Sequence, residues 1–97
     1  MPRQGGEKGV QMFWTYIIQN ILSNRRYIGC TSDLEKRLAE HNRGKTTSTR
    51  YAKGNWKLIY SEQYETYSEA LAREKMIKSY KGGEALKKLL NAGLVHR

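Results

Sequence analysis

Hydrophobic residues near the start of the chain alternate with the period of a β-strand, and they predict a hairpin over residues 12–30. Aromatic and β-branched side chains occupy both alternating sets of positions in residues 13–18, which is typical of a strand covered on both faces. The segment 20–24 indicates a turn, and residues 27–30 predict a second short strand. These two strands form the first part of a small sheet.

A helix is predicted next, from Asp33 to about Asn42. Thr31, Ser32 and Asp33 are candidate caps for this helix. Ser32 and Glu35 also have the spacing of a capping box, in which two side chains satisfy the first free backbone groups of a helix. Gly44 is expected to end the helix, because glycine readily takes the left-handed conformation that terminates many helices.

The rest of the chain adds one strand and two helices. Residues 56–64 predict a third strand, Ser68 is expected to cap a helix over about 69–80, and a third helix is predicted from Glu84 to about Asn91. The order is therefore β-β-α-β-α-α, which predicts an α+β domain with a three-stranded sheet flanked by helices.

Two polar side chains fall on the apolar face of the first predicted helix. Leu34 and Leu38 mark the buried stripe, and Arg37 and His41 share it. Glu40 is expected to point away from this face. Arg37 is either a functional cation or a side chain that lays its stem on the core with its charge in water. His41 is either functional or a hydrogen-bonded histidine at the helix end.

The second predicted helix carries a similar exception in Glu74. This carboxylate falls within the apolar stripe of Ala70, Leu71 and Ile77, where it costs free energy unless it meets a cation, a metal ion or hydrogen-bond donors. One interpretation is an ion pair between Glu74 and Arg37. The other is a Mg²⁺ site, since such sites often combine one or two carboxylates with substrate phosphates and water.

Length and composition restrict the class of protein. Ninety-seven residues make one domain, which we place at 12–97, and residues 1–11 are expected to be a disordered lead or a remnant of cloning. No apolar run approaches the roughly 20 residues of a membrane-spanning helix, so we expect no membrane partner. The single cysteine, Cys30, fits a reducing compartment, and we expect the protein to be cytoplasmic.

The charge of the chain indicates a polyanionic partner. Eighteen Lys and Arg residues against nine Asp and Glu residues give a net charge of +9, and nucleic acid is the commonest partner of such a basic domain. The excess of positive charge is divided between segments 25–57 and 75–97, with an acidic segment at 58–74 between them. A basic protein with no nucleic-acid role is the alternative.

Tyrosine is frequent in this chain, and two tyrosines lie in the strands of the predicted hairpin. The hydroxyls of Tyr16 and Tyr27 could converge on one side of the sheet, although ordinary strand packing also accounts for tyrosine in strands.

The ordered set of these residues resembles the GIY-YIG nuclease family. Thr15-Tyr16-Ile17, followed by Tyr27-Ile28-Gly29, resembles the two halves of the family motif. Arg37 and His41 fall where the family has its arginine and its histidine or tyrosine. Glu74 resembles the family's metal-binding glutamate. The resemblance covers about residues 12–90 and is especially close to the small stand-alone members.

The resemblance implies a fold and a reaction. The fold is an α+β nuclease fold with a small antiparallel sheet, and the reaction is metal-dependent hydrolysis of a DNA phosphodiester bond. Glu74 would hold Mg²⁺, or Mn²⁺ in its place, and Arg37 would stabilise charge on the phosphate. Tyr16 or Tyr27 would orient or deprotonate the attacking water. His41 would bond a tyrosine hydroxyl or a phosphate, or relay a proton.

Small members of the family lack a separate DNA-binding domain, so the resemblance assigns DNA contacts to the polar loop 43–55. Four cations in this loop would bind phosphates and one aromatic ring would stack on an exposed base, the residues being Arg43, Lys45, Arg50, Lys53 and Tyr51. A solvated loop without a partner is the alternative.

Two departures from the family pattern leave a second function open. Thr15 stands where the motif has glycine, and no asparagine follows Glu74 at the spacing of the family's late asparagine. The first hypothesis is a metal-dependent endonuclease that acts on branched, nicked or single-stranded DNA with little sequence preference. The second is a nucleic-acid-binding module of the same fold with weak or no catalysis. The third is a protein-interaction domain whose acidic segment contacts a basic partner.

Overall fold

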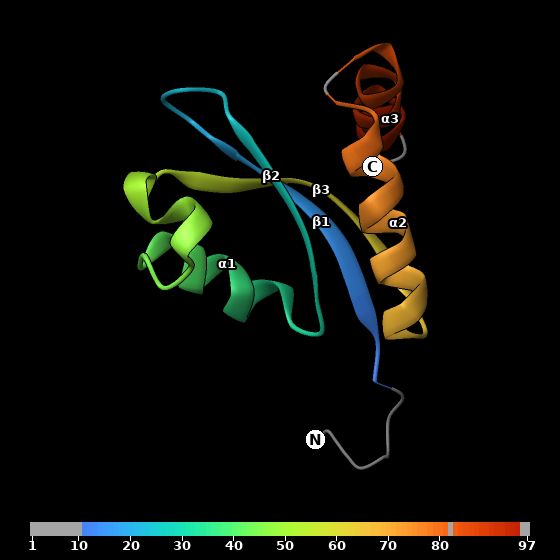
Figure 1. The fold of residues 1–97 in the computed structure, drawn as a ribbon, viewed down its shortest axis with the longest axis horizontal. Helices are drawn as coiled ribbons and strands as arrows, with labels where there is room; N and C mark the ends of the chain where they lie inside the picture. Colours follow the sequence, from blue (N-terminus) through green and yellow to red (C-terminus); the bar gives the residue numbers. More distant parts are fainter. Residues whose placement is uncertain (1–10, 82, 96–97) are drawn as a thin grey trace.

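A computed structural model describes residues 11–81 and 83–95, and its elements follow the predicted order (Figure 1). The elements in chain order are β1 (Phe13–Asn20), β2 (Arg26–Thr31), α1 (Leu34–Asn42), the 3₁₀ helix η1 (Thr47–Ala52), β3 (Trp56–Tyr64), α2 (Tyr67–Ser79) and α3 (Glu84–Val95).

The predicted fold class is confirmed. The three strands form an antiparallel sheet in the order β2-β1-β3. Within the described ranges, no helix is both long enough and apolar enough to cross a membrane. The prediction for the lead segment falls outside the described residues, except for Gln11, which is exposed.

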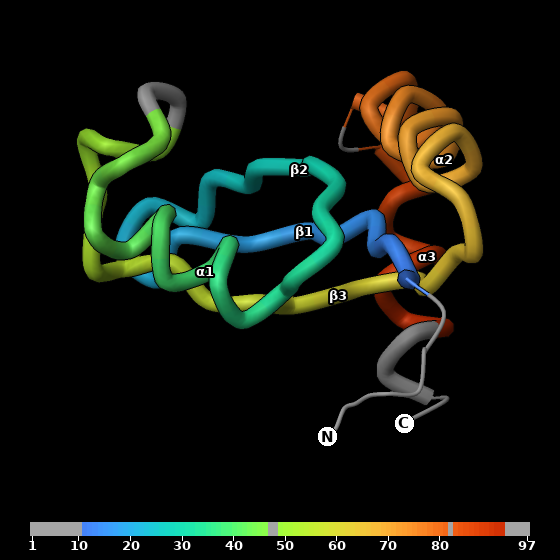
Figure 2. The backbone as a smooth tube through the Cα atoms, turned by 90° about the horizontal axis from the view of Figure 1, so that it is seen from below, coloured from blue at the N-terminus to red at the C-terminus, as the bar shows by residue number. Residues whose placement is uncertain are grey.

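The central strand β1 divides the core into two layers. On one face Tyr16 and Ile18 pack with Trp56 against α1 and η1. On the other face Ile17 packs with Ile77 of α2. Figure 1 shows α1 and η1 to the lower left of the strands and α2 and α3 to their right, and in Figure 2 the helices α1 and α2 again lie toward opposite ends of the view. Because both faces are covered, both alternating sets of side chains in β1 are apolar.

One of the three candidate caps begins α1, whereas α2 begins at a cap other than the predicted one. The Asp33 carboxylate caps α1 by accepting a 3.1 Å hydrogen bond from the backbone N–H of Lys36, in place of the capping box expected at Ser32. Thr66, not Ser68, caps α2, and it forms a capping box with Glu69. Short polar side chains within two residues of one another can all serve as caps, so local sequence did not distinguish them.

The polar segment 43–55 is more structured than the predicted loop. The side-chain amide of Asn42 exchanges two hydrogen bonds with the backbone of Trp56. The Trp56 indole N–H donates to the carbonyl oxygen of Thr49 at 3.0 Å. These bonds fold the segment against α1 and bury the Thr49 side chain completely.

Thr15 connects the central strand to the helix that carries Glu74. Its hydroxyl donates a 2.7 Å hydrogen bond to the carbonyl oxygen of Ala70 in α2, and the side chain is fully buried. A glycine has no group that could make this bond. The departure at Thr15 therefore gives this chain a direct link between β1 and α2.

Replacing Thr15 with valine is expected to lower the free energy of unfolding by about 1 kcal/mol, because the shape is kept while the hydrogen bond is lost. Urea unfolding followed by circular dichroism measures the change. Ser61→Ala, at an exposed site in β3, is the control and should stay within about 0.5 kcal/mol of the wild type. Equal stability of Thr15→Val and the wild type would show that the bond does not stabilise the fold.

Candidate active site

Three of the predicted site residues meet at one phenol oxygen. Tyr16 Oη lies 2.9 Å from Nε2 of His41 and accepts a 3.3 Å hydrogen bond from Nε of Arg37. Tyr16 is only 2% exposed. Burial raises the pKa of its phenol to about 12, although the neighbouring Arg37 acts in the opposite direction. The phenol is therefore protonated at neutral pH.

His41 is fully buried beside this hydroxyl, and both of its ring nitrogens have partners. Nδ1 lies 2.8 Å from Oγ1 of Thr49 in η1. Burial, together with the charge of Arg37, lowers the pKa of the imidazole to about 4. The ring is thus neutral at neutral pH. The resemblance implied that His41 bonds either a tyrosine hydroxyl or a phosphate. In the structure its partner at Nε2 is the Tyr16 hydroxyl.

Tyr27 and Gly29 of β2 complete the surroundings of the phenol. The Tyr27 ring centroid lies 6.3 Å from that of Tyr16 and 4.8 Å from that of His41. Gly29 pairs directly with Tyr16 across the two strands. A Cβ atom on Gly29 would lie 2.8 Å from Tyr16 Oη. Any larger residue would therefore displace the buried hydroxyl.

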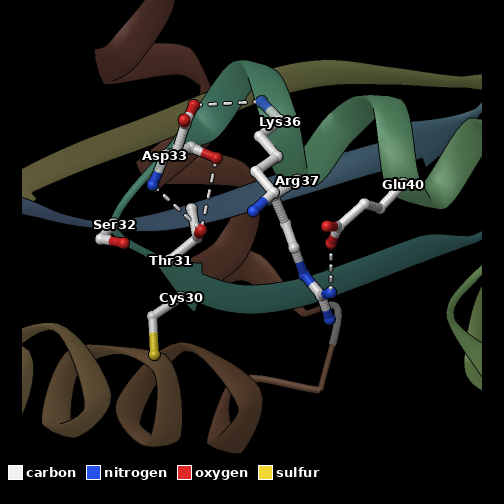
Figure 3. A pocket seen from close by; sticks show the side chains of 7 residues that line it. All are labelled: Cys30, Thr31, Ser32, Asp33, Lys36, Arg37 and Glu40. Carbon is white, nitrogen blue, oxygen red and sulfur yellow. Dashed lines mark hydrogen bonds and ion pairs between the residues drawn. The ribbon is translucent and has the colours of Figure 1, made fainter.

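Arg37 is paired with Glu40 on its own helix, as Figure 3 shows; Nη1 and Oε1 are 3.0 Å apart. Glu40, which was expected to point away from the apolar face, is thus a partner of Arg37, because residues three apart on a helix are neighbours. Arg37 also lines a cavity of about 420 Å³, within the size range of small-ligand sites. The lining residues are Cys30, Thr31, Ser32, Asp33, Lys36, Arg37 and Glu40.

Glu74 approaches the site from α2, on the opposite face of the sheet. Its Oε2 lies 2.6 Å from Nζ of Lys78, and its side chain is 14% exposed. The interpretation of Glu74 and Arg37 as an ion pair is therefore wrong, since Arg37 pairs with Glu40 and Glu74 pairs with Lys78. Each charge pairs within its own helix, because residues one turn apart are nearer than residues on opposite faces of a sheet.

The charge of Glu74 still reaches the residues around β2. It adds to the effect of burial in raising the pKa of the Tyr16 phenol. Burial first, and then the Glu74 carboxylate, raise the pKa of the Cys30 thiol to about 11. For the Tyr16 phenol, the influence of Glu74 is smaller than that of burial or of Arg37.

The donor set fits a hydrated divalent ion better than a metal enclosed by protein ligands. In the part of the chain that the structure describes, no three His, Cys, Asp or Glu side chains gather into a metal-binding group. Mg²⁺ commonly takes one or two carboxylates and completes its shell with water and substrate phosphates. Glu74, a half-buried carboxylate, is suited to that role.

The five residues predicted to contact DNA lie on the surface of the segment around η1, and all are exposed: Arg43, Lys45, Arg50, Tyr51 and Lys53. Tyr51 is 60% exposed. Its ring packs edge-on against Trp56, and the guanidinium of Arg25 lies 5.5 Å from its centroid. This basic surface therefore adjoins the turn between β1 and β2.

Three partners of the site were missed by sequence reasoning. Glu40 and Lys78 lie three and four residues after Arg37 and Glu74, and helical spacing alone could have found them. Thr49 carries no such signal, because it reaches His41 only when η1 folds against α1.

Comparison with known proteins agrees with the resemblance. The sequence model of the GIY-YIG catalytic domain matches residues 12–87. A UPF0213 protein of Staphylococcus saprophyticus is 38% identical over 61 residues, which cover 63% of this chain and 74% of that protein. A UPF0213 protein of Staphylococcus aureus is 43% identical over 54 residues, covering 56% and 66%. These names state no activity, and no solved structure matches the chain.

The buried neutral state of His41 is expected to make stability depend on pH. Its pKa is lowered from 6.5 to about 4 in the folded protein. Between these values the unfolded chain binds a proton that the folded chain does not, so the free energy of unfolding falls as the pH falls. We expect a loss of about 2 kcal/mol between pH 7 and about pH 5, measured by urea unfolding.

His41→Gln is the control for this pH dependence, since glutamine does not titrate. Its stability should change far less than that of the wild type over the same pH range. An equal slope in both proteins would contradict the assignment to His41.

Proposed function

The chain belongs to the GIY-YIG family of nuclease domains, and on this basis we propose that it is an endonuclease that hydrolyses DNA with a divalent metal ion. We further propose that it selects nicked, branched or single-stranded DNA by structure rather than by sequence. The observation that carries this proposal is the arrangement around β2. Tyr16, His41 and Arg37 meet at one buried hydroxyl, and Glu74 on α2 is held by its ion pair with Lys78.

Arg37 and Glu74 provide the charges that hydrolysis of a phosphodiester requires. Glu74 would hold the metal ion, for which we propose Mg²⁺ with Mn²⁺ as a substitute, and Lys78 would keep the carboxylate in place. A bound divalent ion neutralises phosphate charge and assists the leaving oxygen. The Arg37 guanidinium lines the cleft and would stabilise the charge that develops on the phosphate. Its ion pair with Glu40 orients the guanidinium plane.

Tyr16 and His41 would orient the attacking water. The Tyr16 oxygen accepts from Nε of Arg37 and lies 2.9 Å from Nε2 of His41, and the tautomer of the imidazole decides which of these two groups donates. Because burial lowers the pKa of His41 to about 4, its imidazole is a poor proton acceptor, so the pair would hold the water in place rather than take its proton. Tyr27, which is half-buried beside these rings, would help to orient the water.

DNA is the partner that this surface favours. The exposed cations around η1 would bind phosphates, and Tyr51 would stack on an unpaired base. Stacking requires a base outside a continuous duplex, which supports a preference for structured DNA. We also propose that the protein works in a reducing compartment such as the cytoplasm, since Cys30 is a free thiol.

Glu74→Gln should lower cleavage of nicked, flapped, branched or single-stranded oligonucleotides at least about a hundredfold in Mg²⁺ or Mn²⁺, because the amide is a poor metal ligand. Rates are measured on labelled DNA in denaturing gels. Glu65→Gln, which changes an exposed acidic residue before α2, is the matched control and should cleave like the wild type. Chelation of the metal ion should abolish cleavage.

Three results would overturn parts of this proposal. If the wild type cuts no substrate while binding stays tight and salt-sensitive, the nuclease proposal fails and a DNA-binding module of the same fold replaces it. Equal cleavage by Glu74→Gln and the wild type would reject the metal assignment. Absence of DNA binding at low salt would favour the protein-interaction domain.

A further inference from the structure

The turn between β1 and β2 presents two apolar side chains to solvent. Ile21 is 55% exposed and Leu22 is 75% exposed. The same turn carries Arg25 and Arg26, which are also exposed. Neighbouring exposed aliphatic side chains cost free energy in water, and nothing in the proposed chemistry uses them. We call the pair Ile21 and Leu22 the hairpin tip.

The hairpin tip is held in a fixed shape by Asn20, which is 1% exposed at its base. The Asn20 Oδ1 accepts hydrogen bonds from the backbone N–H groups of Leu22 and Ser23, both at 2.9 Å. The backbone N–H of Ile21 is bonded to the loop that precedes β3. The tip is therefore preorganised, and it loses little conformational freedom when it binds a partner.

Cations surround the hairpin tip and join it to the basic surface around η1. The Arg25 guanidinium lies over the exposed Tyr51 ring. Neither the turn 20–26 nor the segment 43–57 contains an acidic residue. An apolar tip flanked by arginines is the combination with which proteins insert side chains between base steps while binding the adjacent phosphates. Charge complementarity therefore favours DNA as the partner of this surface.

The distance from the hairpin tip to the active site sets where on the DNA the tip would act. Ile21 follows Tyr16 by five residues along β1, which corresponds to roughly 17 Å at the rise of a β-strand. This length equals about five base steps of a duplex. DNA lying along the β2 edge would contact the catalytic cleft and the tip together.

We propose that the hairpin tip is a wedge that inserts into DNA at a nick or junction, about five base steps from the phosphate that is cut. The proposal rests on the proposed function in taking DNA as the substrate. Insertion requires unstacking, which costs less where a nick or junction has already weakened the stack. The wedge thus provides a physical basis for selecting substrates by structure.

The test uses the full chain without metal, so that binding is observed in the absence of cleavage. A nicked duplex carries 2-aminopurine beside the nick, and the fluorescence of this base rises when it is unstacked. We expect a rise with the wild type. The double variant Ile21→Ser, Leu22→Ser should lose this rise and bind the nicked duplex about tenfold more weakly. Both replaced side chains are exposed, so the fold should be retained, and circular dichroism checks this.

Met76→Gln is the matched control, because Met76 is also exposed and apolar (51%) but lies on α2. It should behave like the wild type in both measurements. Unchanged fluorescence on saturation with the wild type, or a double variant equal to the wild type, would overturn the wedge. Binding of the tip to anionic phospholipid vesicles without unstacking of DNA would also overturn it.

Failure of the wedge can be distinguished from failure of the proposed function. A fluorescence rise without cleavage in metal would overturn the nuclease, and with it the distance to a cut phosphate, but would leave insertion of the hairpin tip at a nick. Cleavage without a fluorescence rise would overturn the wedge alone. If the wild type binds no DNA at low salt, both proposals are overturned.

Discussion

The hydrogen bonds at the Tyr16 hydroxyl connect three elements of the fold. The oxygen lies on β1 and is bonded to Arg37 and His41 of α1, and His41 is bonded in turn to Thr49 of η1. Tyr16, His41 and Thr49 are almost fully buried, and a buried polar group without a partner costs free energy. A shift of α1 relative to the sheet would break several of these bonds together. Packing on this face and the geometry of the site are therefore coupled.

β2 is an edge strand, with only β1 beside it. The candidate site residues lie on both faces of the sheet next to this strand: Arg37 comes from α1 and Glu74 from α2. Gly29 contributes because it leaves the space that the hydroxyl occupies. The Thr15 bond to Ala70 fixes α2 against β1, so the helix carrying Glu74 is anchored to the strand carrying Tyr16.

Sequence periodicity predicted the order of the elements and the shared face of Arg37 and His41, because helix and strand geometry fix which neighbours in sequence are neighbours in space. It left three candidate caps for α1, of which Asp33 is the one used, and it missed Thr66 as the cap of α2 because Ser68 is locally equivalent. The bond between Tyr16 and His41 depends on how α1 crosses the sheet, which no local pattern encodes.

The hairpin tip shows a similar limit. The turn at 20–24 was predicted, but the exposure of its two aliphatic side chains follows from where the hairpin ends relative to η1 and β3.

A double-mutant cycle between Tyr16 and His41 measures whether the hydrogen bond at the buried hydroxyl couples β1 to α1. The free energy of unfolding is measured at neutral pH for Tyr16→Phe, His41→Leu and the double variant. Each single change leaves a buried polar group without its partner, whereas the double change removes both groups. We expect the double variant to be less destabilised than the sum of the single variants by about 1–2 kcal/mol. Additivity within about 0.5 kcal/mol would contradict this coupling.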